Sequence, residues 1–109
     1  MSLVTNVILM AGVGFDPSID EPSQKAYQAI DDFLQSTCRQ SLKRLDDNRG
    51  AYGGSKCFEV SIWTGAFNYL HLTDFIEILK SIDFPDWVQL SYCGQEDEGF
   101  TFIQIQSAS

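Results

Sequence analysis

The spacing of apolar residues changes repeatedly along this chain, and this alternation restricts the fold more than any other feature. Residues 3–11 are apolar on both faces, which is typical of a buried strand that ends before Gly12. From residue 23 to about residue 45, apolar side chains recur every three or four positions, which predicts one long helix. Residues 57–63 return to strict alternation and predict a second strand, with a bend expected at Gly65.

The remaining pattern adds one helix and two strands. Residues 73–83 form a second apolar stripe, with Thr73 as the expected N-cap and Pro85 beyond the end. Residues 87–93 and 100–106 alternate on either side of an acidic turn, which predicts an antiparallel hairpin. The order β-α-β-α-β-β predicts an α+β fold, a two-layer α/β sandwich in one domain spanning residues 1–109. The two helical connections favour parallel or mixed strand pairing in the earlier part.

Composition restricts the class of protein. Hydrophobic residues make up 44% of the 109 residues, enough for one core. No apolar run approaches the roughly 18 residues of a membrane span, and the first residues lack a basic signal-peptide segment, so we expect a cytoplasmic protein. Three widely spaced cysteines, Cys38, Cys57 and Cys93, favour neither a disulfide framework nor a zinc site.

The formal net charge of −8 is unevenly distributed. Residues 1–56 hold seven acids and six bases, whereas residues 57–109 hold eight acids and only Lys80. Phosphates share this sign, so nucleic acid and anionic membranes are not expected partners. A basic protein surface is the complementary partner.

The candidates for chemistry are few. Gly12-Val13-Gly14 follows a strand but lacks the remaining glycine and lysine positions of a nucleotide-binding loop. The neighbouring acids Asp31-Asp32, Asp46-Asp47 and Glu96-Asp97-Glu98 do not have the alternating spacing of a calcium-binding loop. We therefore predict no catalytic residues, cofactor or metal. The alternative is a small enzyme that uses His71, the only histidine, with Asp74.

Aromatic residues offer a second route to function. Trp63 falls on the strand face that it shares with Glu59 and Ser61. Other aromatics fall in or beside predicted loops, namely Tyr52, Phe67, Tyr69, Phe84 and Trp87. They can serve as anchors for a partner or cap the ends of the sandwich, and the sequence leaves both readings open.

The chain also carries a resemblance. Residues 4–9, 65–70, 87–90 and 96–100 resemble segments of small uncharacterised bacterial and phage-type proteins. In size and charge the chain is similar to bacterial immunity proteins and to acidic phage-encoded inhibitors. The first resemblance carries no known activity, and the second is one of type only and assigns no role to any residue.

These observations favour a non-enzymatic acidic protein of immunity-protein, antitoxin or inhibitor type. It would occupy a basic surface of a toxin nuclease or a nucleic-acid-binding enzyme. The alternative from another class is a self-assembling scaffold that pairs as a homodimer through an edge strand, such as residues 100–106. The expected partner-binding residues are acids and aromatics mainly of the second half: Glu59, Trp63, Asp74, Glu77, Asp86, Trp87, Glu96, Asp97 and Glu98.

Overall fold

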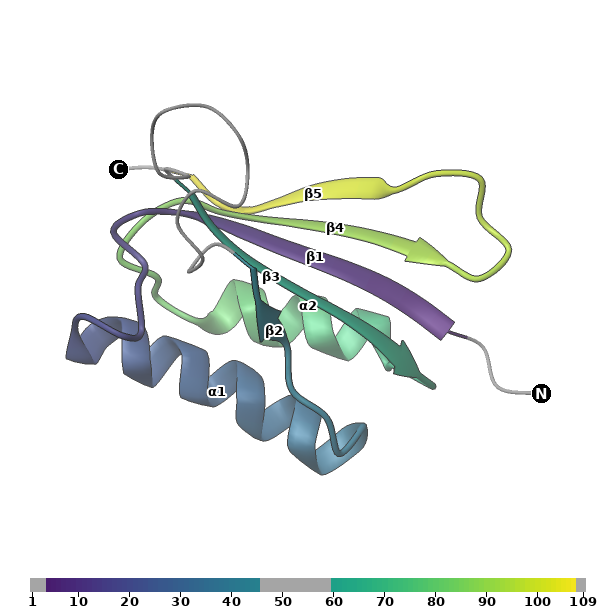
Figure 1. Ribbon diagram of the computed structural model, residues 1–109, viewed down its shortest axis with the longest axis horizontal. Coiled ribbons are helices and arrows are strands. Elements are labelled where there is room, and N and C mark those ends of the chain that lie inside the picture. The colour runs from purple at the N-terminus through teal and green to yellow at the C-terminus, as the bar shows by residue number, and fades with distance from the viewer. Residues whose placement is uncertain (1–3, 46–59, 108–109) are drawn as a thin grey trace.

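The computed structural model describes residues 4–45 and 60–107 (Figure 1). Its elements are β1 (Val4–Gly12), α1 (Glu21–Thr37), β2 (Lys43–Arg44), β3 (Val60–Asn68), α2 (Leu72–Ser81), β4 (Val88–Gly94) and β5 (Thr101–Gln106). The predicted α+β class and element order are confirmed, and the short β2 is an addition. The C-terminal hairpin of β4 and β5 is confirmed as well.

The five strands form one sheet in the order β2-β3-β1-β4-β5, and all neighbours are antiparallel. The expected parallel or mixed pairing was therefore wrong. The connection through α2 does join two strands of the same direction, β3 and β4, but β1 lies between them and pairs with both. Without β5, this is the split β-α-β arrangement of ferredoxin-like folds, which hosts many unrelated functions and assigns none.

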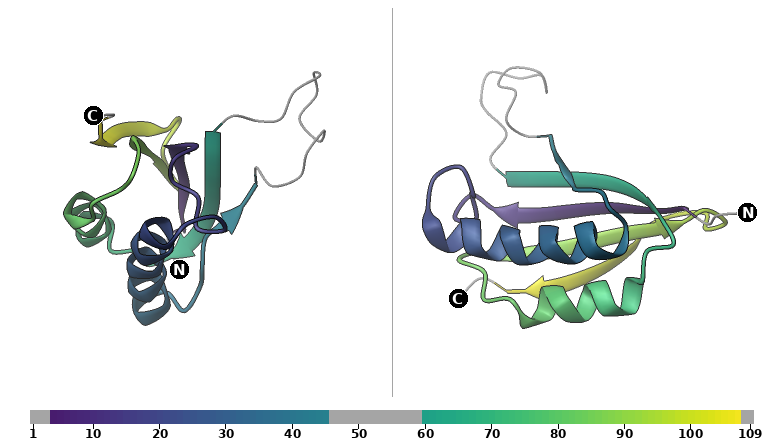
Figure 2. Two further views of the ribbon diagram at one scale, coloured as in Figure 1. Left: turned by 90° about the vertical axis from the view of Figure 1, so that its left-hand side faces the viewer. Right: turned by 90° about the horizontal axis from the view of Figure 1, so that it is seen from below.

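The two helices lie on the same side of the sheet (Figure 2). No helix of the described residues covers the other side, which we call the open sheet face. On the covered side the core includes Leu9, Ile30, Leu34, Phe75 and Leu90, each with no exposed surface. Burial of such side chains is the main favourable contribution to folding. The arrangement gives the molecule two distinct surfaces, a helical face and an open sheet face.

Helix α1 is shorter than the periodicity predicted, because it ends at Thr37 and not near residue 45. The hydroxyls of Ser36 and Thr37 both donate to the Phe33 carbonyl, a local bond that competes with helix continuation. Arg39 then takes a left-handed backbone with φ 56°. Leu42 is still buried, but it reaches the core from the extended segment that leads into β2.

The two faces of strand β3 are exchanged relative to the sequence prediction, which placed Trp63 on the exposed face together with Ser61. Ser61, Trp63 and Phe67 point into the core, whereas Val60 and Ile62 lie on the open face, half-buried. The strand also continues through Gly65, where a bend was predicted. Glycine is needed at this position because the ring of Phe67 occupies the space that a Cβ would take. At α2 the N-cap is His71 and not Thr73, and it makes no side-chain capping bond.

Candidate functional site

The charged side chains divide the two faces of the molecule. In the described part of the chain, no strand contains Asp or Glu, and only Lys43 and Arg44 of β2 carry charge. The carboxylates of that part lie on the helices and connections: Asp16, Asp20, Glu21, Asp31, Asp32, Asp74, Glu77, Asp83, Asp86, Glu96, Asp97 and Glu98. The helical face and the β4–β5 turn are therefore the surfaces to which a basic partner would be attracted.

Several of these carboxylates hold the chain's own backbone. Asp20 caps α1 by accepting a bond of 2.8 Å from the Ser23 amide. Asp97 accepts from the Gly94 amide at 2.7 Å. A carboxylate that accepts a hydrogen bond from the backbone has a structural role, and fewer of its acceptor positions remain for a partner.

Asp86 fills the glycine loop after β1. It accepts bonds from the amides of Gly14 at 2.9 Å and Trp87 at 2.8 Å. A Cβ on Gly12 would overlap this carboxylate. The place where a nucleotide loop would hold phosphate is thus occupied by a carboxylate of this protein.

Asp16 belongs to a partly buried cluster at the end of the core. Its Oδ1 accepts a bond of 2.7 Å from Nη1 of Arg44, whose guanidinium also lies 5.3 Å from the centre of the Trp63 ring. The bond from Arg44, together with bonds from Ser18, lowers the pKa of Asp16 to about 2. Burial, with a contribution from the charge of Asp31, raises the pKa of the nearby Tyr27 and keeps its phenol neutral.

Four acids, Glu21, Asp74, Glu77 and Asp83, border a seam between α1 and α2, which we call the interhelical groove. One hollow of about 540 Å³ is lined by Glu21, Pro22, Lys25, Ala26, Ile82 and Asp83. A second hollow of about 420 Å³ is lined by Phe33, Asp74, Glu77, Ile78 and Ser81. Both hollows are shallow and open to solvent.

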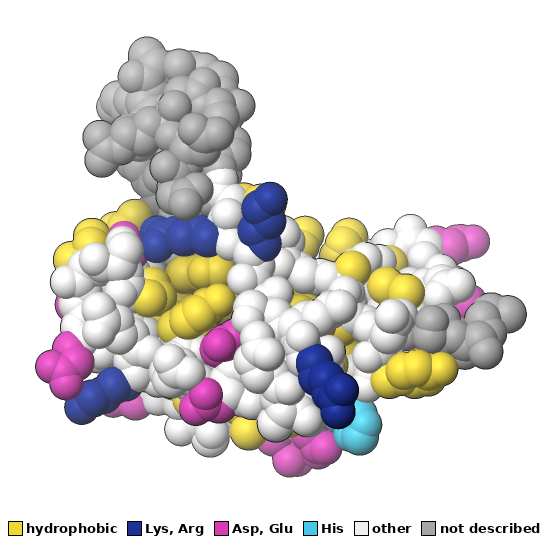
Figure 3. All heavy atoms as spheres, turned by 60° about the horizontal axis from the view of Figure 1, so that its bottom comes forward, with side chains coloured by type: hydrophobic (Ala, Val, Ile, Leu, Met, Phe, Trp, Pro, Cys, Tyr) yellow, Lys and Arg dark blue, Asp and Glu magenta, His cyan; other side chains and the backbone are white. Residues whose placement is uncertain are grey.

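The groove combines an apolar floor with a rim that is acidic at Asp74, Glu77 and Asp83, whereas Glu21 is paired with Lys25 at 3.4 Å. Phe33, Ile78 and Ile82 are half-buried, whereas Asp74 and Glu77 are exposed at the border. Figure 3 shows this side of the molecule, on which carboxylates lie next to apolar side chains over the two helices. Such a surface can accept a segment that carries both apolar and basic side chains.

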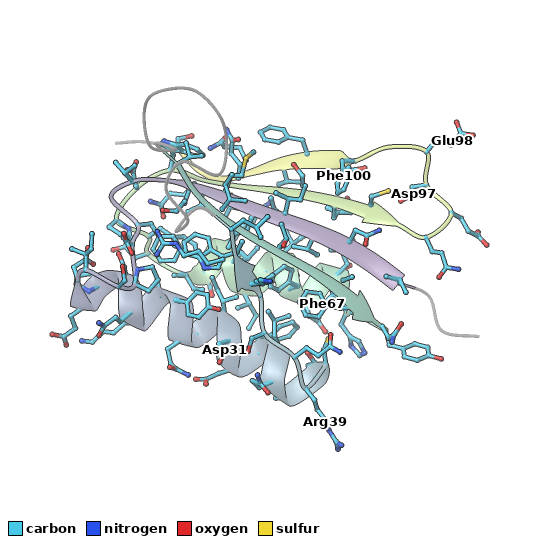
Figure 4. The ribbon with its side chains drawn as sticks, viewed as in Figure 1. Asp31, Arg39, Phe67, Asp97, Glu98 and Phe100 are labelled. Atoms are coloured by element: carbon cyan, nitrogen blue, oxygen red, sulfur yellow. The ribbon has the colours of Figure 1, made fainter. Side chains whose placement is uncertain are left out.

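The β4–β5 turn is a separate acidic site at the far end of the hairpin (Figure 4). Glu96, Asp97 and Glu98 are all exposed there. Asp97 is turned back toward Gly94, whereas Glu98 points away from the molecule. The turn borders a smaller hollow of about 230 Å³, lined by Val4, Thr5, Gly94, Gln95, Glu96 and Asp97.

The predicted partner-binding residues thus separate into groups. Asp74 and Glu77 meet in the groove, and Glu96 and Glu98 lie in the turn. Trp63 is only 2% exposed, so its proposed role as a surface anchor was wrong. Asp86 is engaged with backbone amides, Trp87 is half-buried, and Glu59 lies outside the described residues.

Two of the five aromatics predicted in or beside loops are buried in the core. Phe67 and Phe84 are 1% and 4% exposed, and Tyr52 lies outside the described residues. Tyr69 is exposed. The sequence reading did not single out Phe100 and Phe102 as exposed, although the alternation of β5 could have indicated that they share one face.

The groove also contains residues that were not predicted as site residues. Glu21 and Asp83 lie far apart in the sequence, and only the antiparallel packing of α1 and α2 brings them to one hollow. Phe33 falls outside the core stripe of α1, a signal that could have marked it as a surface residue.

The alternative enzyme would need His71 in a pocket. The His71 side chain is 67% exposed and its Nδ1 lies 3.8 Å from Asp74, with neither hollow of the groove including it. Within residues 4–45 and 60–107, no three side chains of the His, Cys, Asp and Glu types gather as metal ligands would. No helix in that part of the chain has the length and apolar character needed to cross a membrane.

No protein family model, curated protein or solved structure matches this chain.

Proposed function

We propose that this chain is a non-enzymatic binding protein that holds a basic surface of another protein against its helical face. The observation that carries the proposal is the interhelical groove, where half-buried apolar side chains are bordered by exposed carboxylates. Apolar contact supplies affinity, and the acidic rim selects basic partners and speeds their approach.

The partner that fits best is a segment with apolar residues on one side and Lys or Arg beside them. Helices that bind in grooves use this pattern, with anchors spaced three or four residues apart. A toxin nuclease or a nucleic-acid-binding enzyme presents such basic surfaces. The role would then be of immunity-protein, antitoxin or inhibitor type in a bacterial or phage setting, acting in the cytoplasm.

The groove and the turn can be separated experimentally. The probe is a fluorescent peptide with Leu and Lys at helical spacing, and the control peptide carries Glu in place of Lys. The variants Asp74→Asn with Glu77→Gln and Glu96→Gln with Glu98→Gln each remove two negative charges, so long-range attraction falls equally in both. Unfolding temperatures of both variants are measured first to establish that they fold.

Fluorescence anisotropy should show binding of the basic peptide only. The groove variant should weaken binding by about five- to tenfold, because two rim charges each contribute up to about 1 kcal/mol. The turn variant should change it by less than about twofold, since it alters only long-range attraction. Equal loss in both variants would refute a specific groove, and absence of binding would refute the function.

A further inference from the structure

Among the described residues, strand β5 is an edge strand of the sheet. It has β4 as its one neighbour in the strand order, whereas the opposite edge, β2, is only two residues long. Natural proteins commonly protect edge strands with Lys, Pro or a bulge on the edge. The sequence of β5 is Thr-Phe-Ile-Gln-Ile-Gln, with no charged residue and no proline. Its pairing with β4 shifts register between Val88 and Gln89, so an irregularity falls at the C-terminal end of β5, whereas Thr101–Gln104 pair in regular register.

The edge also presents exposed aromatic surface. Phe100 and Phe102 are 52% and 54% exposed. Phe102 pairs with Ser91, which in turn pairs with Ile8 of β1, so Phe102 lies at the border of the open sheet face. An uncharged edge strand with exposed phenylalanines combines backbone hydrogen-bonding groups at the sheet edge with apolar contact area.

We infer that β5 pairs antiparallel with β5 of a second copy and forms a closed, two-fold symmetric dimer. A symmetric antiparallel pair places the same alternate side chains of both strands on one face, so the phenylalanines and Gln104 of both copies form one uncharged patch. Aromatic pairs across strands stabilise such a ladder.

Charge favours a second copy over the basic partner as the occupant of this edge. In the described strands no carboxylate is available to attract a basic segment, because the acids lie on the helices and connections. A second copy brings an equally uncharged strand. The inference rests on β5 alone and does not depend on the groove.

The net charge predicts how salt acts on the dimer. Each copy carries −8, and Glu96 and Glu98 lie in the turn that leads into β5. Repulsion between the copies weakens as ionic strength rises, so the dimer should strengthen with salt. Binding of a basic peptide in the groove should weaken with salt, so the two proposals fail independently.

Sedimentation velocity over a range of protein concentrations, at low and at high salt, tests the dimer. Phe102→Lys places a charge on the edge and should raise the dissociation constant by about tenfold or more. The matched control is Ile19→Lys, at a site 76% exposed in the β1–α1 connection, with the same charge change. It should leave the dissociation constant within about twofold.

Hydrogen exchange identifies the surface directly. Amides of β5 should become more protected as protein concentration rises, and those of α1 should not, because only edge pairing gives β5 new hydrogen bonds. If Phe102→Lys does not fold, Gln104→Lys, also exposed on β5, replaces it. A monomer at every concentration and salt level, or equal weakening by Ile19→Lys, would overturn the inference.

Discussion

Asp16 links the end of β1 to β2 through Arg44, and its contribution to stability should depend on pH. The side chains of Asp16 and Arg44 are 16% and 21% exposed. The Asp16 carboxylate also accepts bonds from the amide and the hydroxyl of Ser18. These donors favour the charged carboxylate and hold its pKa at about 2, below the ordinary value of 3.8.

A lowered pKa in the folded state stabilises the fold above the unfolded value, and the effect is lost as pH falls toward the folded value. Each pKa unit corresponds to about 1.4 kcal/mol. The shift from 3.8 to about 2 therefore sets an upper bound of about 2.4 kcal/mol. Because solvent still reaches the pair, we expect a contribution of about 1–2 kcal/mol.

Urea unfolding of the wild type and Asp16→Asn from pH 7 to pH 2 measures this contribution. The variant should be less stable by about 1–2 kcal/mol near pH 7, and the difference should shrink between about pH 4 and pH 2. Asp32→Asn, which removes an exposed carboxylate bonded to Gln28, is the matched control and should have little effect. A difference between Asp16→Asn and wild type that stays constant with pH would refute the reasoning.

Four further substitutions test the fold by urea unfolding. Trp63→Ala should lower the unfolding free energy by about 3–5 kcal/mol. A loss well below this range would contradict the burial of Trp63 in the core. Gly12→Ala and Asp86→Ala should each destabilise by about 1–3 kcal/mol. Their combination should cost less than the sum, because both disturb the same carboxylate; additive losses would contradict the packing. Arg39→Gly should stabilise the protein by up to about 1 kcal/mol, since glycine removes the left-handed strain. A loss of stability would show that contacts of the Arg39 side chain outweigh this strain.

The elements of this fold were largely predictable, because hydrophobic period reports local structure. The end of α1 was not, since the apolar stripe continues in phase through Leu42, which is buried in an extended segment. The deciding features were the local bonds of Ser36 and Thr37 and the left-handed Arg39. Periodicity identifies which positions are buried, but it does not show whether a helix or a non-helical segment carries them into the core.

The direction of the β3 alternation was also beyond the sequence. Strict alternation separates Ser61 and Trp63 from Val60 and Ile62, but it does not say which set faces the helices. Trp63 was assigned to the surface because polar neighbours share its face. In the structure, Ser61 donates to the Phe15 carbonyl at 3.1 Å, so a polar residue is satisfied inside the core.

The candidate site was predictable only as a charge asymmetry. Asp74 and Glu77 could be named from the sequence, whereas Phe33 and Glu21 joined them through the packing of α1 against α2. Asp86 and Asp97 look like any other surface acid in the sequence. Their bonds to backbone amides depend on turn geometry that composition does not contain.

The most direct test of the binding account is a map of where a basic peptide contacts the protein. Isotope-labelled protein is titrated with the Leu–Lys peptide and followed by NMR. The account predicts saturable shifts concentrated at Phe33, Ile78 and Ile82 and at the rim residues Asp74 and Glu77. Shifts confined to the β4–β5 turn or to the open sheet face, or no saturable shifts, would contradict it.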